Sequence, residues 1–203
     1  MDSPDRTPVL SPGLRVKPSE PSVLEGRMGA LLDQKYAKLF FLLDANGDGV
    51  IAEDDFALMA DRVTAAFGEE RTAKGRTYAA EMTNYWRALR ETADADGDGR
   101  IDQDEFRRAV SRVSDKFDTL IGPLYLAGFR LADRDDDGLV GRDDFVTVLV
   151  AIGVPAAEAE ATFDRLTEDG EPLTEDRLMT AAAHYYRDED PAHTASHLLF
   201  GAL

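Results

Sequence analysis

The sequence contains no cysteine in its 203 residues. Disulfide bonds, thiolate metal sites and cysteine nucleophiles are therefore excluded. Basic residues are also scarce, because 23 Lys and Arg stand against 40 Asp and Glu, for a formal net charge of -17. Nucleic acids and anionic membranes bind through positive patches, so this charge argues against both as partners. It favours metal cations or basic protein surfaces.

Long apolar runs are missing as well. No stretch approaches the roughly 18 consecutive apolar residues that a membrane-spanning helix needs. The N-terminus, MDSPDRTPVLSPGLRVKPSEP, is polar and rich in proline, without the apolar centre of a signal peptide. We therefore expect a cytoplasmic protein with a disordered tail over residues 1–22. Pro18 and Pro21 have the spacing of a PxxP partner motif, although a solvated leader is the simpler interpretation.

Sequence motifs of common catalytic sites are absent too. The chain has no G-x-S-x-G and no phosphate-binding loop. Its histidines are His184, His193 and His197. The last two lie four residues apart and could share a transition metal on a helix, but ordinary surface histidines are the simpler interpretation. We therefore predict that the chain is not an enzyme.

What the chain does have is one acidic pattern in three copies. The copies read DANGDGVIAEDDF from Asp44, DADGDGRIDQDEF from Asp94 and DRDDDGLVGRDDF from Asp133. A twelve-residue calcium loop needs oxygen ligands at positions 1, 3 and 5, a backbone carbonyl at 7 and a carboxylate at 12. It also needs glycine at position 6, where the backbone turns sharply. All three segments satisfy these requirements.

The candidate metal ligands follow from this register. They are Asp44, Asn46, Asp48, the Val50 carbonyl and Asp55 in the first loop; Asp94, Asp96, Asp98, the Arg100 carbonyl and Glu105 in the second; and Asp133, Asp135, Asp137, the Leu139 carbonyl and Asp144 in the third. An acidic turn that caps a helix and binds nothing is the alternative, but three aligned copies argue against it. The sequence therefore predicts three calcium sites.

Apolar residues at helical spacing flank every loop, which predicts a helix on each side. Before the loops they are Leu32, Tyr36, Leu39 and Phe40; Met82, Trp86 and Leu89; and Ile121, Tyr125 and Phe129. After the loops they are Phe56, Met59, Ala60, Val63 and Phe67; Phe106, Ala109, Val110, Val113 and Phe117; and Phe145, Val148, Leu149 and Ile152. Arg90 and Gly128 interrupt the stripes, so their helices are expected to pack less well. Position 8 is Ile51, Ile101 or Val140, and β-branched residues there suit a short strand that pairs two loops.

Because such loops pair, a fourth loop is expected after the third. The segment FDRLTEDGEPLTEDRLMTAAAHYY keeps the apolar positions Phe163, Leu166, Leu173 and Leu178. Its ligands fail, because Thr167 replaces the first Asp, Pro172 stands near the turn and Arg177 takes the closing position. We predict a vestigial unit that packs against the third one. Residual binding through Asp169 and Glu171 is the alternative.

These loops and flanks resemble EF-hand proteins, and the chain is similar to the four-hand sarcoplasmic calcium-binding proteins and the calerythrin type. The resemblance covers residues 24–203. It implies an all-α fold, in which two pairs of EF-hands pack into one compact globule with short paired loop strands. The first pair would span residues 23–116 and the second pair residues 117–203. The resemblance also implies a calcium buffer or signal modulator.

The closing residues suggest that the three sites differ. Asp55 and Asp144 are one methylene shorter than Glu105. Either the loop contracts around Asp, or the carboxylate binds through one oxygen and leaves about six ligands, the number that magnesium prefers. We expect the second site to be the tightest for calcium. The first and third are expected to be weaker and more tolerant of magnesium.

A calcium buffer and a calcium sensor remain open at this point. A sensor offers a Met-rich groove, but Met28, Met59, Met82 and Met179 are scattered over separate units. Gly122-Pro123 argues against a rigid central helix, and the terminal HLLFGAL is a candidate to fill a groove. We therefore favour a buffer that is a monomer, with a sensor that exposes an apolar groove to an unknown protein target as the alternative.

Overall fold

The computed structural model describes residues 34–167 and 171–187 of the chain, and its regular structure is almost entirely helical. The elements are a helix over residues 34–43, α2 (Glu53–Phe67), α3 (Ala73–Ala93), α4 (Gln103–Ser114), the π-helix η1 (Phe117–Ile121), α5 (Gly122–Ala132), β1 (Leu139–Val140), α6 (Arg142–Ala151), α7 (Ala156–Leu166), β2 (Leu173–Thr174) and α8 (Glu175–Arg187). The predicted all-α fold is confirmed. Within the described ranges, no helix has the length and apolar character that crossing a bilayer requires. The proline-rich tail and the HLLFGAL segment lie outside these ranges.

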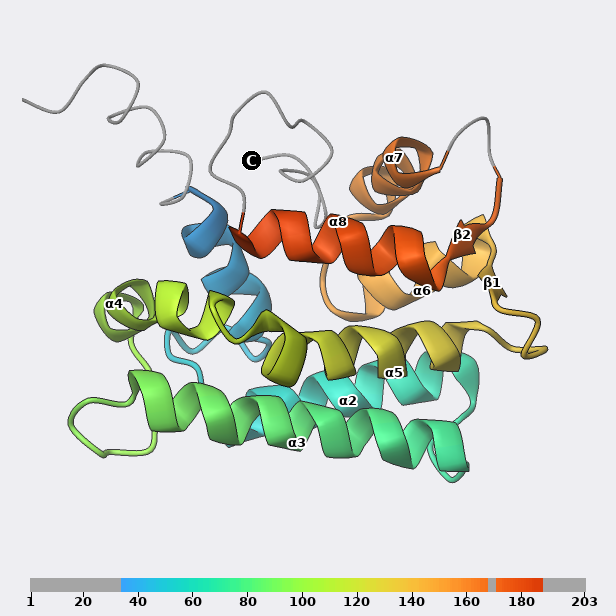
Figure 1. Cartoon of the computed structure of the whole chain (residues 1–203). Coiled ribbons are helices and arrows are strands. Elements are labelled where there is room, and N and C mark those ends of the chain that lie inside the picture. Colours follow the sequence, from blue (N-terminus) through green and yellow to red (C-terminus); the bar gives the residue numbers. More distant parts are fainter. Residues whose placement is uncertain (1–33, 168–170, 188–203) are drawn as a thin grey trace, which may run out of the picture.

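Four helix–loop–helix units follow one another along the chain (Figure 1). The first joins the helix at residues 34–43 to α2, the second joins α3 to α4, the third α5 to α6 and the fourth α7 to α8. Helices α3, α5 and α8 run side by side with α5 in the middle. Because α3 belongs to the second unit and α5 to the third, the two pairs pack directly against each other.

The loops pair at the positions that the sequence predicted. Ile51 and Ile101 form an antiparallel bridge, and each donates its N–H to the carbonyl of the other at 2.9 Å. In the second pair, strands β1 and β2 are antiparallel and Val140 faces Leu173. All four side chains are buried. Each pair of loops is therefore held by backbone hydrogen bonds over an apolar contact, and the fourth unit keeps this pairing although it lost its ligands.

Gly128, which interrupts an apolar stripe, is buried on α5 in the contact with α3. A Cβ atom added there would lie 3.5 Å from Cε2 of Tyr78 on α3, an ordinary van der Waals distance. The Tyr78 ring therefore lies next to the backbone of α5 across the boundary between the two pairs. Arg90, the other interruption, is exposed and lies outside the core.

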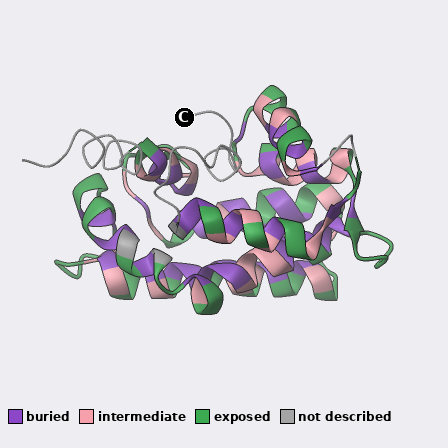
Figure 2. Ribbon diagram, turned by 45° about the horizontal axis from the view of Figure 1, so that its top comes forward, coloured by how far each residue is buried: buried purple, intermediate pink, exposed green. Residues whose placement is uncertain are grey.

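The core is continuous through the described helices, and Figure 2 shows their buried faces turned inward. Phe40 packs edge-on against Phe106, with ring centroids 5.7 Å apart. Phe56 packs against Trp86 at 5.5 Å. These contacts join entering and exiting helices of different units. Because aromatic pairs add packing energy beyond their buried area, they fix how the first two units sit against each other.

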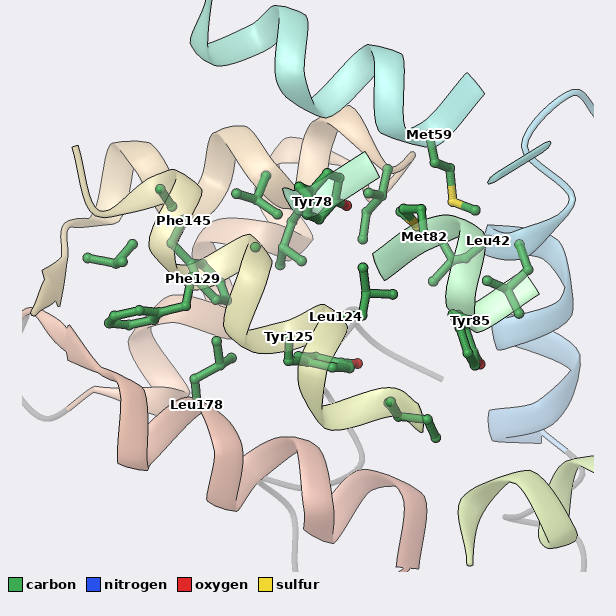
Figure 3. Close-up of a pocket in the computed structure, with 18 of the residues that line it drawn as sticks. Leu42, Met59, Tyr78, Met82, Tyr85, Leu124, Tyr125, Phe129, Phe145 and Leu178 are labelled. Carbon is green, nitrogen blue, oxygen red and sulfur yellow. The ribbon is translucent and has the colours of Figure 1, made fainter. Parts of the chain in front are cut away.

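An apolar cavity of about 120 Å³ lies between the two pairs. Figure 3 shows Tyr78, Met82, Tyr85, Tyr125 and Phe129 around it. Burial raises the pKa of each of these tyrosines above its ordinary value, so their hydroxyls stay neutral. The cavity is therefore an uncharged space between the two pairs, and it extends to Val140 and Leu173 of the paired loop strands.

Candidate metal centres

Each acidic loop begins where its entering helix ends. The N–H of Asp44 donates to the carbonyl four residues earlier at 2.9 Å, and Asp94 and Asp133 do the same at 3.0 and 2.8 Å. Asp44 and Asp133 are buried, and Asp94 is half-buried. The first carboxylate of every loop is thus fixed to a rigid helix end and turned into the loop that follows.

The first carboxylate organises the loop backbone. In the first loop, Asp44 Oδ1 accepts hydrogen bonds from the N–H groups of Gly47 and Asp48 at 2.9 and 3.1 Å. The position-6 glycine donates to the other oxygen in every loop: Gly49 to Asp44 at 2.9 Å, Gly99 to Asp94 at 3.1 Å and Gly138 to Asp133 at 3.0 Å. These glycines have φ values of 91°, 82° and 83°, in the left-handed region where a side chain would be strained.

The other acidic side chains converge on the same point. Carboxylate oxygens of Asp94, Asp96 and Asp98 lie within 4.8 Å of one another, and so do those of Asp133, Asp135 and Asp137. The first loop has Asn46 at the middle position, and its Oδ1 accepts the N–H of Asp48 at 2.8 Å. A cluster of oxygen donors without nitrogen or sulfur suits a hard cation such as Ca²⁺ or Mg²⁺. The residues present therefore fit the predicted ion.

The closing residue folds over the first two loops. Asp55 is completely buried and accepts the N–H of Asn46 at 3.0 Å and the N–H of Ala52 at 2.8 Å, one with each oxygen. Glu105 accepts the N–H of Ala95 at 3.0 Å and that of Asp102 at 3.1 Å in the same manner. Because both residues lie in the first turn of an exiting helix, their carboxylates cap the helix and close the loop together.

The third loop closes differently. Asp144 is half-buried, and within the described part of the chain no hydrogen bond to its carboxylate is found. The residue before helix α6 is Gly141, which has no side chain to cap the helix. In the second loop, by contrast, Asp102 caps the N–H of Glu105 at 2.8 Å. The first and third loops both end in Asp, so the sequence alone predicts the same closure for both. The structure shows that their last carboxylates are held differently.

Burial affects the charge of Asp55. Loss of water raises the pKa of its carboxyl above the ordinary 3.8, and the nearby Asp54 and Asp44 charges act in the same direction, whereas the N–H donors of Ala52 and Asn46 oppose them. A buried carboxylate among like charges is costly unless a cation compensates it. The site therefore has the electrostatics of an ion-binding loop.

The fourth loop keeps the backbone of a hand without its ligands. The N–H of Thr167 donates to the carbonyl of Phe163 at 3.0 Å, which is the contact that the first Asp makes in the other loops. Its hydroxyl donates to the same carbonyl at 2.8 Å and so turns back to the helix. Arg177 is exposed. Asp169 lies outside the described residues, and His184 is exposed on α8, whereas His193 and His197 lie outside.

The loops also have basic neighbours that the loop pattern does not predict. Lys74, near the start of α3, lies 2.5 Å from the carbonyl oxygen of Asp133 and 2.7 Å from Oδ1 of Asp136. On α2, Arg62 donates to the carbonyl of Ala45 at 3.3 Å. The loop pattern contains no signal for Lys74, because it lies 59 residues before Asp133.

Comparison with protein-family models gives two matches. The model described as an EF hand matches residues 91–111, and the model described as an EF-hand domain pair matches residues 128–152. These ranges contain the second and third acidic loops. The matches therefore agree with the register that places Asp94 and Asp133 at position 1.

Known proteins with similar chains include two that are described as calcium-binding proteins. Calerythrin from Saccharopolyspora erythraea is 25% identical over 167 residues, which cover 77% of this chain and 93% of calerythrin. A solved Streptomyces coelicolor calcium-binding protein, described in connection with prokaryotic calcium-mediated regulation, is 31% identical with a TM-score of 0.69 and covers 76% of this chain and 96% of its own. A sarcoplasmic calcium-binding protein from amphioxus is 20% identical with a TM-score of 0.64, and the match covers 83% of this chain and 96% of that protein.

The loop geometry, the family matches and these relatives agree with one another. Oxygen ligands converge in helix–loop–helix units that are paired through position 8. The chain therefore belongs to the EF-hand proteins, of the four-hand type of calerythrin and the sarcoplasmic calcium-binding proteins, and it is a calcium-binding protein rather than an enzyme.

Proposed function

We propose that the chain binds three calcium ions, one in each of the loops that begin at Asp44, Asp94 and Asp133. The convergence of carboxylate oxygens in the second and third loops, together with a left-handed glycine at position 6 of all three, carries this proposal. The ligands are the residues that the sequence assigned, with the carbonyls of Val50, Arg100 and Leu139 at position 7. The fourth loop serves as the structural partner of the third and binds no ion.

The three sites differ in strength in this proposal. The second loop has the longest closing ligand, Glu105, which can present both oxygens and complete the seven-ligand shell that calcium accepts. Asp55 keeps the hydrogen bonds of Glu105 despite its shorter side chain, whereas Asp144 lacks them. We therefore place calcium affinity highest in the second loop and lowest in the third. Tolerance of magnesium follows the reverse order and is greatest in the third loop.

Calorimetric titration of single-loop variants tests the assignment. Asp44→Asn, Asp94→Asn and Asp133→Asn each remove one charged ligand without changing side-chain size. We expect each variant to lose one calcium-binding event, with the largest loss of total binding free energy for Asp94→Asn. Asp115→Asn removes one exposed carboxylate outside the loops and is the matched control. Equal calcium affinity and equal magnesium competition at all three sites would refute the order.

The fold supports a cytoplasmic calcium buffer or modulator. Met59 and Met82 are buried and line the central cavity instead of an open groove. The chain passes from α4 through the π-helix η1 into α5, so the two pairs are not separated by a long helix. A monomer without a nucleic-acid or membrane partner is consistent with the net charge of -17. Its protein target, if it has one, is unassigned.

A calcium sensor is the second candidate. The Streptomyces relative is described in connection with calcium-mediated regulation, and the apolar cavity between the pairs could open toward a target helix. A sensor would increase the fluorescence of an apolar dye several-fold when calcium is added, because apolar surface becomes accessible. A buffer would leave the dye signal nearly constant while the same calcium binds. The titration therefore separates the two candidates.

A further inference from the structure

Lys74 connects the third loop to the first EF-hand pair. It lies in the first turn of α3, the entering helix of the second hand, yet its ammonium group contacts the third loop. The Nζ atom is 2.5 Å from the carbonyl oxygen of Asp133 and 2.7 Å from Oδ1 of Asp136. Asp133 is the first ligand of this loop, so a fixed positive charge sits beside the acidic cluster.

The third loop has a backbone feature that this lysine supports. Position 4 is Gly47 or Gly97 in the first two loops, each with φ of 76°, and it is Asp136 with φ of 60° in the third. A left-handed conformation is strained for residues other than glycine, although Asp tolerates it better than most. The contact with Lys74 anchors the Asp136 side chain in this position. Only 26% of the Lys74 side chain is exposed, against 75% for Asp136, so the lysine is the better-fixed partner.

We propose that Lys74 lowers the affinity of the third loop for divalent cations and thereby sets its place as the weakest of the three sites. The inference rests on the proposed function of this loop. A unit positive charge in contact with the backbone carbonyl of the first ligand residue repels a divalent ion in the loop by an amount that corresponds to about threefold in affinity at moderate ionic strength. The loosely held Asp144 and this lysine weaken the same site by independent means.

The same contact couples the third site to the second hand. Helix α3 starts with Lys74 in its first turn and ends at Ala93, directly before the first ligand of the second loop, Asp94. A calcium ion in the third loop repels Lys74 and so perturbs one end of this helix. By linkage, the metal at one site then changes the affinity of the other in a reciprocal manner. Loss of the lysine charge removes this path.

The position-6 glycines give a separate readout for each loop. The N–H groups of Gly49, Gly99 and Gly138 each donate to the first Asp of their own loop. Their amide cross-peaks in ¹H–¹⁵N spectra of the full chain can be followed while a chelating buffer sets the free calcium. The variants are Lys74→Gln, which removes the charge, Lys74→Arg, which keeps it, and Lys116→Gln, which removes an exposed charge away from the loops.

The largest expected change is in the third loop. With Lys74→Gln, half-saturation of the Gly138 signal moves to about threefold lower free calcium, and added salt reduces the difference. Gly49 keeps its midpoint, and Lys74→Arg and Lys116→Gln behave like the parent chain. Native positions of the Gly49 and Gly99 signals at saturating calcium show that the variants fold.

Three outcomes would overturn the inference. An unchanged Gly138 midpoint with Lys74→Gln shows that the charge is not felt at the site. A midpoint at higher calcium shows that the lysine assists binding, and an equal shift with Lys116→Gln shows a general charge effect. A Gly138 signal that does not respond to calcium in the parent chain removes the proposed third site itself, and this is distinct from a responsive signal that Lys74 does not move.

Discussion

The first and third loops end in the same residue type, but their final carboxylates lie in different surroundings. Asp55 is completely buried and accepts two backbone hydrogen bonds, whereas Asp144 is half-buried and shows none in the described structure. The first loop pairs with an intact second loop, and the third pairs with a loop that has lost its ligands. The two loops therefore share a ligand pattern but differ in their partner loops and in the burial of the last carboxylate, and we expect these differences to affect how strongly each loop binds.

Removal of calcium is expected to have the largest effect on this pair of loops. One site contributes about 2.7 kcal/mol to the free energy of unfolding when free calcium is a hundredfold above its dissociation constant. The melting temperature should therefore fall strongly when a chelator replaces calcium, as scanning calorimetry can measure. Asp44→Asn should remove more of this stabilisation than Asp133→Asn, because the first loop is held more completely. No change in melting temperature with calcium would contradict metal binding.

The second-largest difference between the first and third loops is expected when the closing residue is lengthened. Asp55→Glu adds a methylene to a completely buried side chain, and such overpacking is expected to cost about 1–3 kcal/mol of calcium-free stability. Asp144→Glu places the same methylene at a half-exposed position and should change that stability by less than about 0.5 kcal/mol. Denaturant unfolding in chelator measures both.

The same pair of variants tests magnesium tolerance. Asp144→Glu should increase the preference of the third loop for calcium over magnesium, because a longer carboxylate can offer both oxygens. The Gly138 amide signal in mixed calcium and magnesium reports this change. The stability measurement has its own contradicting outcome. If Asp55→Glu and Asp144→Glu changed the calcium-free stability equally, the difference in burial between Asp55 and Asp144 would have no effect on stability.

A smaller difference in stability is expected between substitutions of two glycines in the third loop. Gly138 has φ of 83°, so Gly138→Ala is expected to cost about 1 kcal/mol or more of stability. Gly141 is the N-cap of α6, with φ of -74° and open space around its Cα, so Gly141→Ala loses only the capping preference of glycine over alanine and should cost less than Gly138→Ala. Thermal unfolding compares the two variants directly. A larger loss for Gly141→Ala would contradict the loop geometry.

The smallest expected effect is a pH dependence of the calcium-free stability that comes from Asp55. The pKa of Asp55 is raised above 3.8, so the folded state holds this proton more tightly than the unfolded state. The calcium-free protein therefore gains stability relative to Asp55→Asn as the pH falls through the raised pKa toward 3.8. It loses this gain as the pH rises through the same pKa. Urea unfolding of both proteins across this range checks the sign, and a difference that does not vary with pH would contradict it.

Much of the architecture could be predicted because it depends on local sequence. The position-6 glycines and the pairing of Ile51 with Ile101 follow from a fixed twelve-residue register. The fourth loop is one residue shorter, and its apolar positions Phe163 and Leu173 align Thr167 with the first Asp. Helical stripes such as Phe56 to Val63 are buried as expected, since the 3.6-residue period fixes which side chains share a face.

What could not be predicted depends on contacts between units. Gly128 looked like a gap in a stripe, but it accommodates the ring of Tyr78 from another helix. The loop pattern of the second hand does not include Lys74. This residue reaches Asp133 only because α3 packs against α5. The orientation of Asp144 also depends on its neighbours, since the same residue type is buried at Asp55.

Native mass spectrometry of the full chain counts the ions that the loops bind. At saturating calcium we expect three bound ions and no fourth. In a competing excess of magnesium, one calcium ion should exchange before the others, and the Asp133→Asn variant should lose that easily exchanged ion. A fourth bound calcium ion would contradict the assignment of the last loop as structural. Two ions, or three that exchange together, would contradict the difference between the first and third loops.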